Sequence, residues 1–146
     1  PLRIPLPMSD FHDLHTGRLW SVMSWEQLTG FWTRIDPAAG WYLYAVGEPV
    51  PGAPAAAGQV SAFIAQMDAL LRKEHQHDYC GIVYADQLDA PNFIKIFDPN
   101  NLGVSCGFSD NPPLPGWILC RVPPEDLKPD APLPEGRKRW WRALFG

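Results

Sequence analysis

The stretch VSAFIAQMDALL, residues 60–71, decides the fold of this 146-residue chain. Its apolar side chains recur at intervals of three and four residues, which places them on one face of an α-helix. These side chains belong to Val60, Phe63, Ile64, Met67, Leu70 and Leu71. The stretch therefore predicts an amphipathic helix that lies on an apolar core, and the rest of the chain has to supply that core.

Short apolar runs on both sides of this helix predict the strands of a sheet. One run, 41–46, precedes the helix, and four follow it at 80–85, 93–97, 104–108 and 117–122. Residues typical of turns bound each run. The later runs are spaced by about a dozen residues, which is too short for crossover helices, so the strands should be antiparallel neighbours.

Two further helices are expected near the ends of the chain. Ser24 is followed three residues later by Gln27, the layout of a capping box, and predicts a short helix to about residue 34. Residues 137–145 predict a final short helix. The expected fold class is α+β: a single antiparallel sheet of about five strands, one long amphipathic helix packed on it, and short N- and C-terminal helices.

The expected organisation has three parts. Residues 1–19 are polar and interrupted by proline, and they are predicted to be irregular. Residues 20–136 form a single α+β domain, since 146 residues are too few for two good cores. Residues 137–146 are a basic-aromatic C-terminal tail.

The charges divide unevenly between the domain and the tail. The last ten residues hold four basic and no acidic side chains, so residues 1–136 hold 8 basic and 16 acidic side chains, a balance of −8. An acidic surface repels phosphates, so no nucleic-acid partner is expected for the domain.

The cysteines bear on the compartment. Cys80, Cys106 and Cys120 cannot all pair within one chain, and their spacings match no zinc motif. Reduced thiols are typical of the cytoplasm, the expected location. Residues 1–7 do not resemble a signal peptide, and no apolar run is long enough for a transmembrane segment. The general character is that of a small bacterial protein, with no cofactor expected.

The tail supplies the candidate partner-binding residues, namely Arg137, Arg139, Trp140, Trp141 and Phe145. A segment that alternates cations with large apolar groups docks in a groove of a partner protein, or makes peripheral contact with an anionic membrane. It is equally suited to folding back onto its own domain, where its cations would pair with acidic residues. All three alternatives stay open at the level of sequence.

The polar segment 98–107 supplies the candidate ligand-binding residues Asp98, Asn100 and Asn101. It also holds Cys106, which would be the nucleophile of a thiol enzyme if a base lay nearby. The alternative is a tight hairpin in which the amide side chains form Asx turns and the thiol packs in the core.

His75 and His77, beside Asp78, are the other candidates for chemistry. Imidazole and carboxylate groups are zinc ligands, and His77 is the candidate base for Cys106. The alternative is that both histidines end an exposed helix, where a cation suits the C-terminal dipole. No known ligand spacing matches, so no metal is expected.

These observations favour a non-enzymatic cytoplasmic accessory or protein-interaction module, whose partner is another protein. The alternative is a small thiol- or metal-dependent enzyme, or a small-ligand-binding protein, that uses the 98–107 loop. A homodimer is compatible with both. The two functions predict different positions for the histidines, because an enzyme would bring them within hydrogen-bond reach of Cys106.

Overall fold

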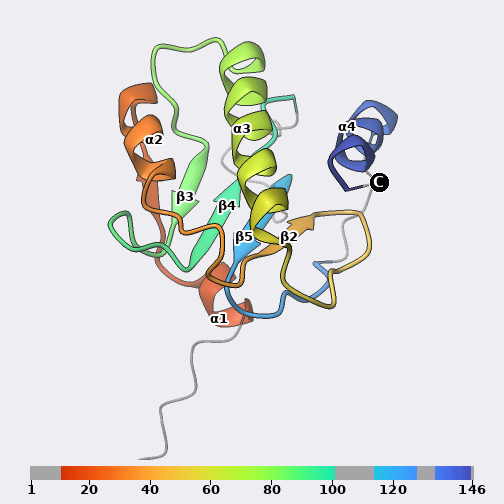
Figure 1. Ribbon diagram of the computed structural model, residues 1–146. Coiled ribbons are helices and arrows are strands. Elements are labelled where there is room, and N and C mark those ends of the chain that lie inside the picture. Colours follow the sequence, from red (N-terminus) through yellow and green to blue (C-terminus); the bar gives the residue numbers. More distant parts are fainter. Residues whose placement is uncertain (1–10, 101–113, 128–133, 146) are drawn as a thin grey trace, which may run out of the picture.

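The computed structural model describes residues 11–100, 114–127 and 134–145. Within these ranges the chain forms four helices and one antiparallel sheet of five strands, which confirms the expected α+β class (Figure 1). In chain order the elements are α1 (Phe11–Thr16), β1 (Trp20–Val22), α2 (Trp25–Trp32), β2 (Tyr42–Ala45), α3 (Ala57–Glu74), β3 (Val83–Ala85), β4 (Phe93–Ile96), β5 (Trp117–Cys120) and α4 (Glu135–Phe145).

The strand order is β1-β3-β4-β5-β2, and every neighbouring pair is antiparallel. The three described strands that follow α3 are consecutive antiparallel neighbours, and β3 pairs with β4 as the short spacing predicted. The direct pairing of β4 with β5 was not predicted, because the strand expected at 104–108 would have come between them in the meander. The two strands that precede α3 add to the outer edges of this meander. The strand predicted at 104–108 lies outside the described residues, and β1 is a strand that the sequence analysis did not predict.

Helix α3 covers one face of the sheet, and α2 lies beside it on the same side (Figure 1). Its buried residues are Val60, Phe63, Met67, Leu70 and Leu71, while Ile64 is partly buried. The periodic stretch 60–71 is therefore the core-facing part of a helix of 18 residues.

The two faces of the sheet differ in chemistry, because successive residues of a strand point to opposite sides. On the face under α3, one row of cross-strand neighbours is buried and apolar: Val22, Val83, Ile96, Trp117 and Ala45. The adjacent row points to the other face and is mixed: Ser21, Tyr84, Lys95, Ile118 and Tyr44.

That second face is covered in part by α1, so the expectation of an irregular segment is wrong for Phe11–Thr16. Residues 1–10 of that segment lie outside the described residues. Phe11 is buried and its ring contacts the rings of Tyr44 and Phe93, at centroid distances of 6.4 and 5.8 Å. A helix of six residues has too few turns to show a periodic pattern. Its contact with the sheet, rather than its own propensity, stabilises it.

The capping prediction for α2 is confirmed. The Ser24 hydroxyl accepts a hydrogen bond from the Gln27 backbone N–H at 2.9 Å. The Gln27 side chain accepts one from the Met23 backbone N–H at 2.9 Å, one residue before the cap. These contacts satisfy backbone donors at the beginning of the helix.

Candidate functional site

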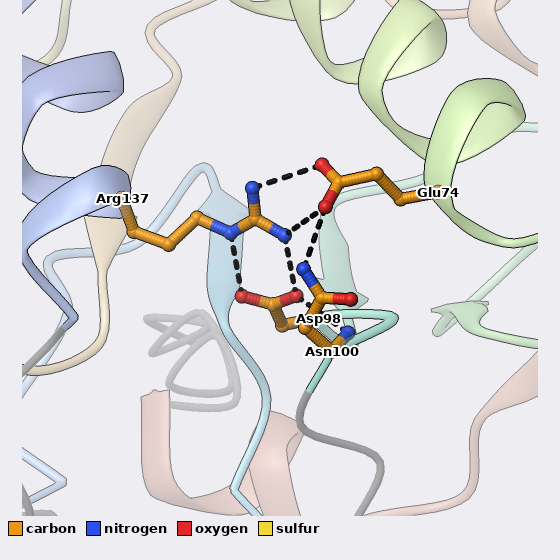
Figure 2. A network of polar contacts seen from close by, with 4 residues as sticks. All are labelled: Glu74, Asp98, Asn100 and Arg137. Atoms are coloured by element: carbon orange, nitrogen blue, oxygen red, sulfur yellow. Dashed lines mark hydrogen bonds and ion pairs between the residues drawn. The ribbon is translucent and has the colours of Figure 1, made fainter.

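Four predicted or adjacent polar residues meet at one end of α4, and Figure 2 shows them: Glu74, Asp98, Asn100 and Arg137. The Arg137 guanidinium donates to both Asp98 oxygens, from Nε and Nη2, each at 2.9 Å. It also donates to both Glu74 oxygens, from Nη1 at 2.9 Å and from Nη2 at 3.0 Å. The Asn100 amide donates to Glu74 Oε1 at 2.6 Å.

Three separate elements bring these side chains together. Glu74 is the last residue of α3, Asp98 lies two residues beyond β4, and Arg137 lies in the first turn of α4. The Asp98 side chain is only 9% exposed. Gly116 allows the close packing there, because a Cβ at that position would lie 3.1 Å from the Asp98 Cβ.

The charges of this cluster compensate one another. Hydrogen bonds from Arg137 are the main cause that lowers the pKa of Glu74, and burial opposes them. Hydrogen bonds to Asp98 are the main cause that raises the pKa of Arg137. The guanidinium also lies 5.8 Å from the centroid of the Trp117 ring. Since Nε, Nη1 and Nη2 all contact carboxylates, the cluster joins α4 to the domain.

The aromatic residues of the predicted tail pack on the same domain. The Trp140 ring lies 6.2 Å from that of Phe63 on α3 and 5.5 Å from that of Trp117 on β5. The Trp141 ring lies 6.0 Å from Phe63 and 4.4 Å from Phe145. All three tail aromatics are half-buried. The outward face of α4 presents the exposed side chains of Arg139 and Arg142.

The predicted ligand loop is described only in part. Asp98 accepts a hydrogen bond from the Asn100 backbone N–H at 2.9 Å, which forms an Asx turn. The alternative interpretation expected such turns from the amide side chains of Asn100 and Asn101 instead. Asn101 and Cys106 lie outside the described residues. The structure thus brings Asp98 and Asn100 together with Arg137, which the sequence analysis had assigned to a different site.

The two candidate metal-binding histidines lie beside each other, with ring centroids 4.6 Å apart. His75 is buried and its Nε2 lies 2.9 Å from the Cys80 carbonyl oxygen. Burial lowers the pKa of His75. The Trp25 indole N–H donates to the His77 carbonyl at 2.9 Å, which ties this segment to α2. Within 11–100, 114–127 and 134–145, no three His, Cys, Asp or Glu side chains form a group that could hold a metal ion.

The two thiols that the structure describes are buried. Burial raises the pKa of Cys80, and it raises the pKa of Cys120 to about 12. A thiol that stays protonated at neutral pH is a poor nucleophile. Cys80 and Cys120 therefore serve as small core residues.

Three exposed hydrophobic residues lie on β1, directly after it and on the segment that precedes β3. Large hydrophobic side chains are exposed there at Trp20 (50%), Met23 (54%) and Tyr79 (56%). The Met23 carbonyl accepts a hydrogen bond from the Cys80 backbone N–H at 2.8 Å, which places Tyr79 next to Met23. Arg18 lies over the Trp20 ring at 5.1 Å. We call Trp20, Met23 and Tyr79 the edge surface.

Comparison with protein-family models, with curated proteins and with solved structures finds no match for this chain. Among the described helices, none has the length and apolar character that crossing a membrane requires.

Proposed function

We propose that this chain is a non-enzymatic protein-interaction module that binds a partner protein through the edge surface. The observation that carries the proposal is the exposure of Trp20, Met23 and Tyr79, which lie on neighbouring segments. Each of these residues is at least half exposed to solvent. A single exposed hydrophobic residue is ordinary, whereas several large ones on neighbouring segments are typical of an interaction site.

The position of β1 adds a second reason. It is the first strand in the sheet order, so β3 is its one neighbour within the described sheet. The free edge of a strand offers backbone N–H and C=O groups to a partner strand, and flanking side chains supply specificity. Aromatic and methionine side chains are enriched at the centres of such interfaces.

The charged side chains near the predicted ligand loop are engaged with one another, because Arg137 pairs with both Asp98 and Glu74. Free thiols also support the proposal that the protein works in the cytoplasm, where thiols stay reduced.

Photo-crosslinking in the native cells tests the proposal. A photoreactive amino acid at position 23 of the full chain should capture a specific partner chain. The matched control places it at position 73, an exposed site on α3 that lies outside the edge surface. Capture of a second copy of this chain would identify a homodimer through the same surface.

A surface variant separates the edge surface from α4. The double variant Trp20→Thr and Met23→Gln should keep the native circular dichroism and lose the crosslinked partner in pull-downs. The control Arg139→Ala and Arg142→Ala changes the outward face of α4 and should keep it. Equal capture from positions 23 and 73, or loss of the partner only in the α4 variant, would overturn the proposal.

A further inference from the structure

Two imidazole rings lie beside each other just beyond the end of α3. The ring centroids of His75 and His77 are 4.6 Å apart, and the ring planes meet at 59°. The backbone holds the pair together, because the His77 N–H donates to the His75 carbonyl at 3.0 Å. The Trp25 side chain holds it against α2, since its indole N–H donates to the His77 carbonyl and its ring lies 6.0 Å from that of His75.

The hydrogen bond to Cys80 fixes which nitrogen of His75 carries a lone pair. The Cys80 carbonyl oxygen can only accept, so Nε2, which lies 2.9 Å away, carries the proton. The neutral ring then has its lone pair on Nδ1. Burial lowers the pKa of His75, so this neutral form is present at pH 7. A histidine that binds a metal through one nitrogen usually donates from the other to a carbonyl or carboxylate, which orients the ring.

The Nδ1 atom of His75 is within reach of a small ion, although the residue as a whole is only 5% exposed. It has no hydrogen-bond partner in the parts of the chain that the structure describes. It is nevertheless not one of the fully buried side-chain atoms without a partner there, which are His15 Nδ1, Ser21 Oγ, Glu48 Oε1 and Trp117 Nε1. The small exposed part of His75 therefore includes Nδ1, and His77 beside it is exposed.

The distance between the two rings matches the geometry of a shared metal ion. At a metal–nitrogen distance of about 2.0 Å, the centre of an imidazole ring lies about 3.1 Å from the ion. Two rings at neighbouring corners of a square-planar site are then about 4.4 Å apart, and two at corners of a tetrahedron are about 5.1 Å apart. The observed 4.6 Å lies between these values and closer to the square-planar one.

We propose that His75 Nδ1 and a ring nitrogen of His77 bind a divalent copper ion, with water in the remaining positions. Cu²⁺ prefers square-planar nitrogen and oxygen ligands, and it binds such sites more tightly than the other first-row divalent metals. Within the described residues, no group of three His, Cys, Asp or Glu side chains forms around these rings, so the protein supplies two ligands and leaves the site open. This site does not depend on the proposed function, and its test needs no partner protein.

Titration of the full chain with copper sulfate at pH 7.5 tests the site. The Cys106→Ser variant is the reference protein, so that this thiol neither binds nor reduces the metal. Electron paramagnetic resonance should show one bound Cu²⁺ coupled to two imidazole nitrogens. His77→Gln should weaken the affinity by about tenfold or more, because it removes one of the two protein ligands. The matched control His12→Gln changes an exposed histidine on α1 and should leave the affinity unchanged.

A second variant tests the role of His75. In His75→Gln the side-chain amide still donates to the Cys80 carbonyl but offers no ring nitrogen to the metal. It should therefore keep the native circular dichroism and weaken Cu²⁺ binding as much as His77→Gln does. If His75→Gln does not fold, His77→Gln and the nitrogen coupling decide the question, since His77 is exposed. Unchanged affinity in His77→Gln, loss of affinity in His12→Gln, or coupling to fewer than two imidazole nitrogens would overturn the proposal.

Discussion

The Arg137 side chain, on the last described helix, pairs with acidic side chains of the domain. Its guanidinium lies between Glu74 and Asp98, and its side chain is only 14% exposed. Burying charges costs free energy, which the paired geometry offsets. Removing one of these charged side chains should therefore cost more free energy of unfolding than the whole cluster contributes. The reason is that the remaining charges stay buried without a partner.

We expect Arg137→Met to lower the free energy of unfolding by about 2–3 kcal/mol, since it leaves the Asp98 carboxylate nearly buried without its cation. Urea denaturation followed by tryptophan fluorescence measures this change. Arg142→Met, on the exposed face of the same helix, is the matched control and should stay within about 0.5 kcal/mol of the wild type. Equal stability of the two variants would contradict a stabilising role for the cluster.

His15 makes the stability of the fold depend on pH. Its pKa is about 4 in the folded protein, against an ordinary value of 6.5 in the unfolded chain. Between these values the unfolded chain binds more protons, so the free energy of unfolding falls as the pH falls from about 6.5 to about 4. Above this range His15 is neutral in both states and contributes no pH dependence.

We expect the wild type to lose more stability than His15→Phe between pH 7 and pH 4.5. The difference should be about 1–2 kcal/mol, after allowance for the solvent that reaches the partly exposed ring. Urea denaturation at pH 7, 5.5 and 4.5 measures both proteins. All other acidic and histidine groups are common to the wild type and His15→Phe. Equal losses of stability in the two proteins would therefore show that His15 is not the group responsible.

At the scale of elements, α4 behaves as a part of the domain. Trp140 packs against Phe63 and Trp117, which belong to α3 and β5, and the Arg137 cluster fixes the first turn. The amphipathic pattern of this helix predicted an apolar face, but an apolar face fits a partner as well as it fits the chain's own sheet. The contact with Trp117 distinguishes these alternatives for the described structure.

We expect Trp140→Ala to destabilise the fold by about 2–3 kcal/mol, less than for a fully buried tryptophan because the side chain is only partly buried. Arg139→Ala, one residue earlier on the exposed face, should change stability by less than about 0.5 kcal/mol. Thermal or urea unfolding compares the two. If Trp140→Ala were as stable as the control, the packing of α4 on the domain would be incidental, and the tail would be available to a partner.

The predictability of the elements follows their length. Helix α3 was evident because residues 60–71 repeat the apolar spacing over several turns, and α2 was evident from the Ser24 cap. By contrast, β1 has three residues and α1 has six, and neither is long enough to show a period. The edge surface, which depends on β1, was missed for the same reason.

For the molecule as a whole, the two described thiols indicate whether the apolar clusters on the two faces of the sheet stay closed. Cys80 belongs to the cluster under α3, and Cys120 belongs to the cluster on the opposite face. Both are fully buried and have raised pKa values. Their reaction with a thiol reagent therefore requires the fold to open.

We expect the variant Cys106→Ser, which retains the two buried thiols, to react with a disulfide reagent at least about a thousandfold more slowly when native than when unfolded in urea. The absorbance of the released thiolate measures both rates. Rapid labelling of one cysteine in the native protein would show that its side of the sheet opens locally, and would contradict a single well-packed core.

The α+β class, the long helix and three strands of the meander could be predicted before the structure, because they depend on local periodicity and on turn residues adjacent in the chain. Only the tertiary structure placed Arg137 between Glu74 and Asp98, which are 63 and 39 positions away in sequence. It alone showed that a lysine between two isoleucines faces His15, and that Trp20 and Met23 are exposed beside Tyr79. Such juxtapositions come from the register of strands and the docking of helices, and no short segment encodes them.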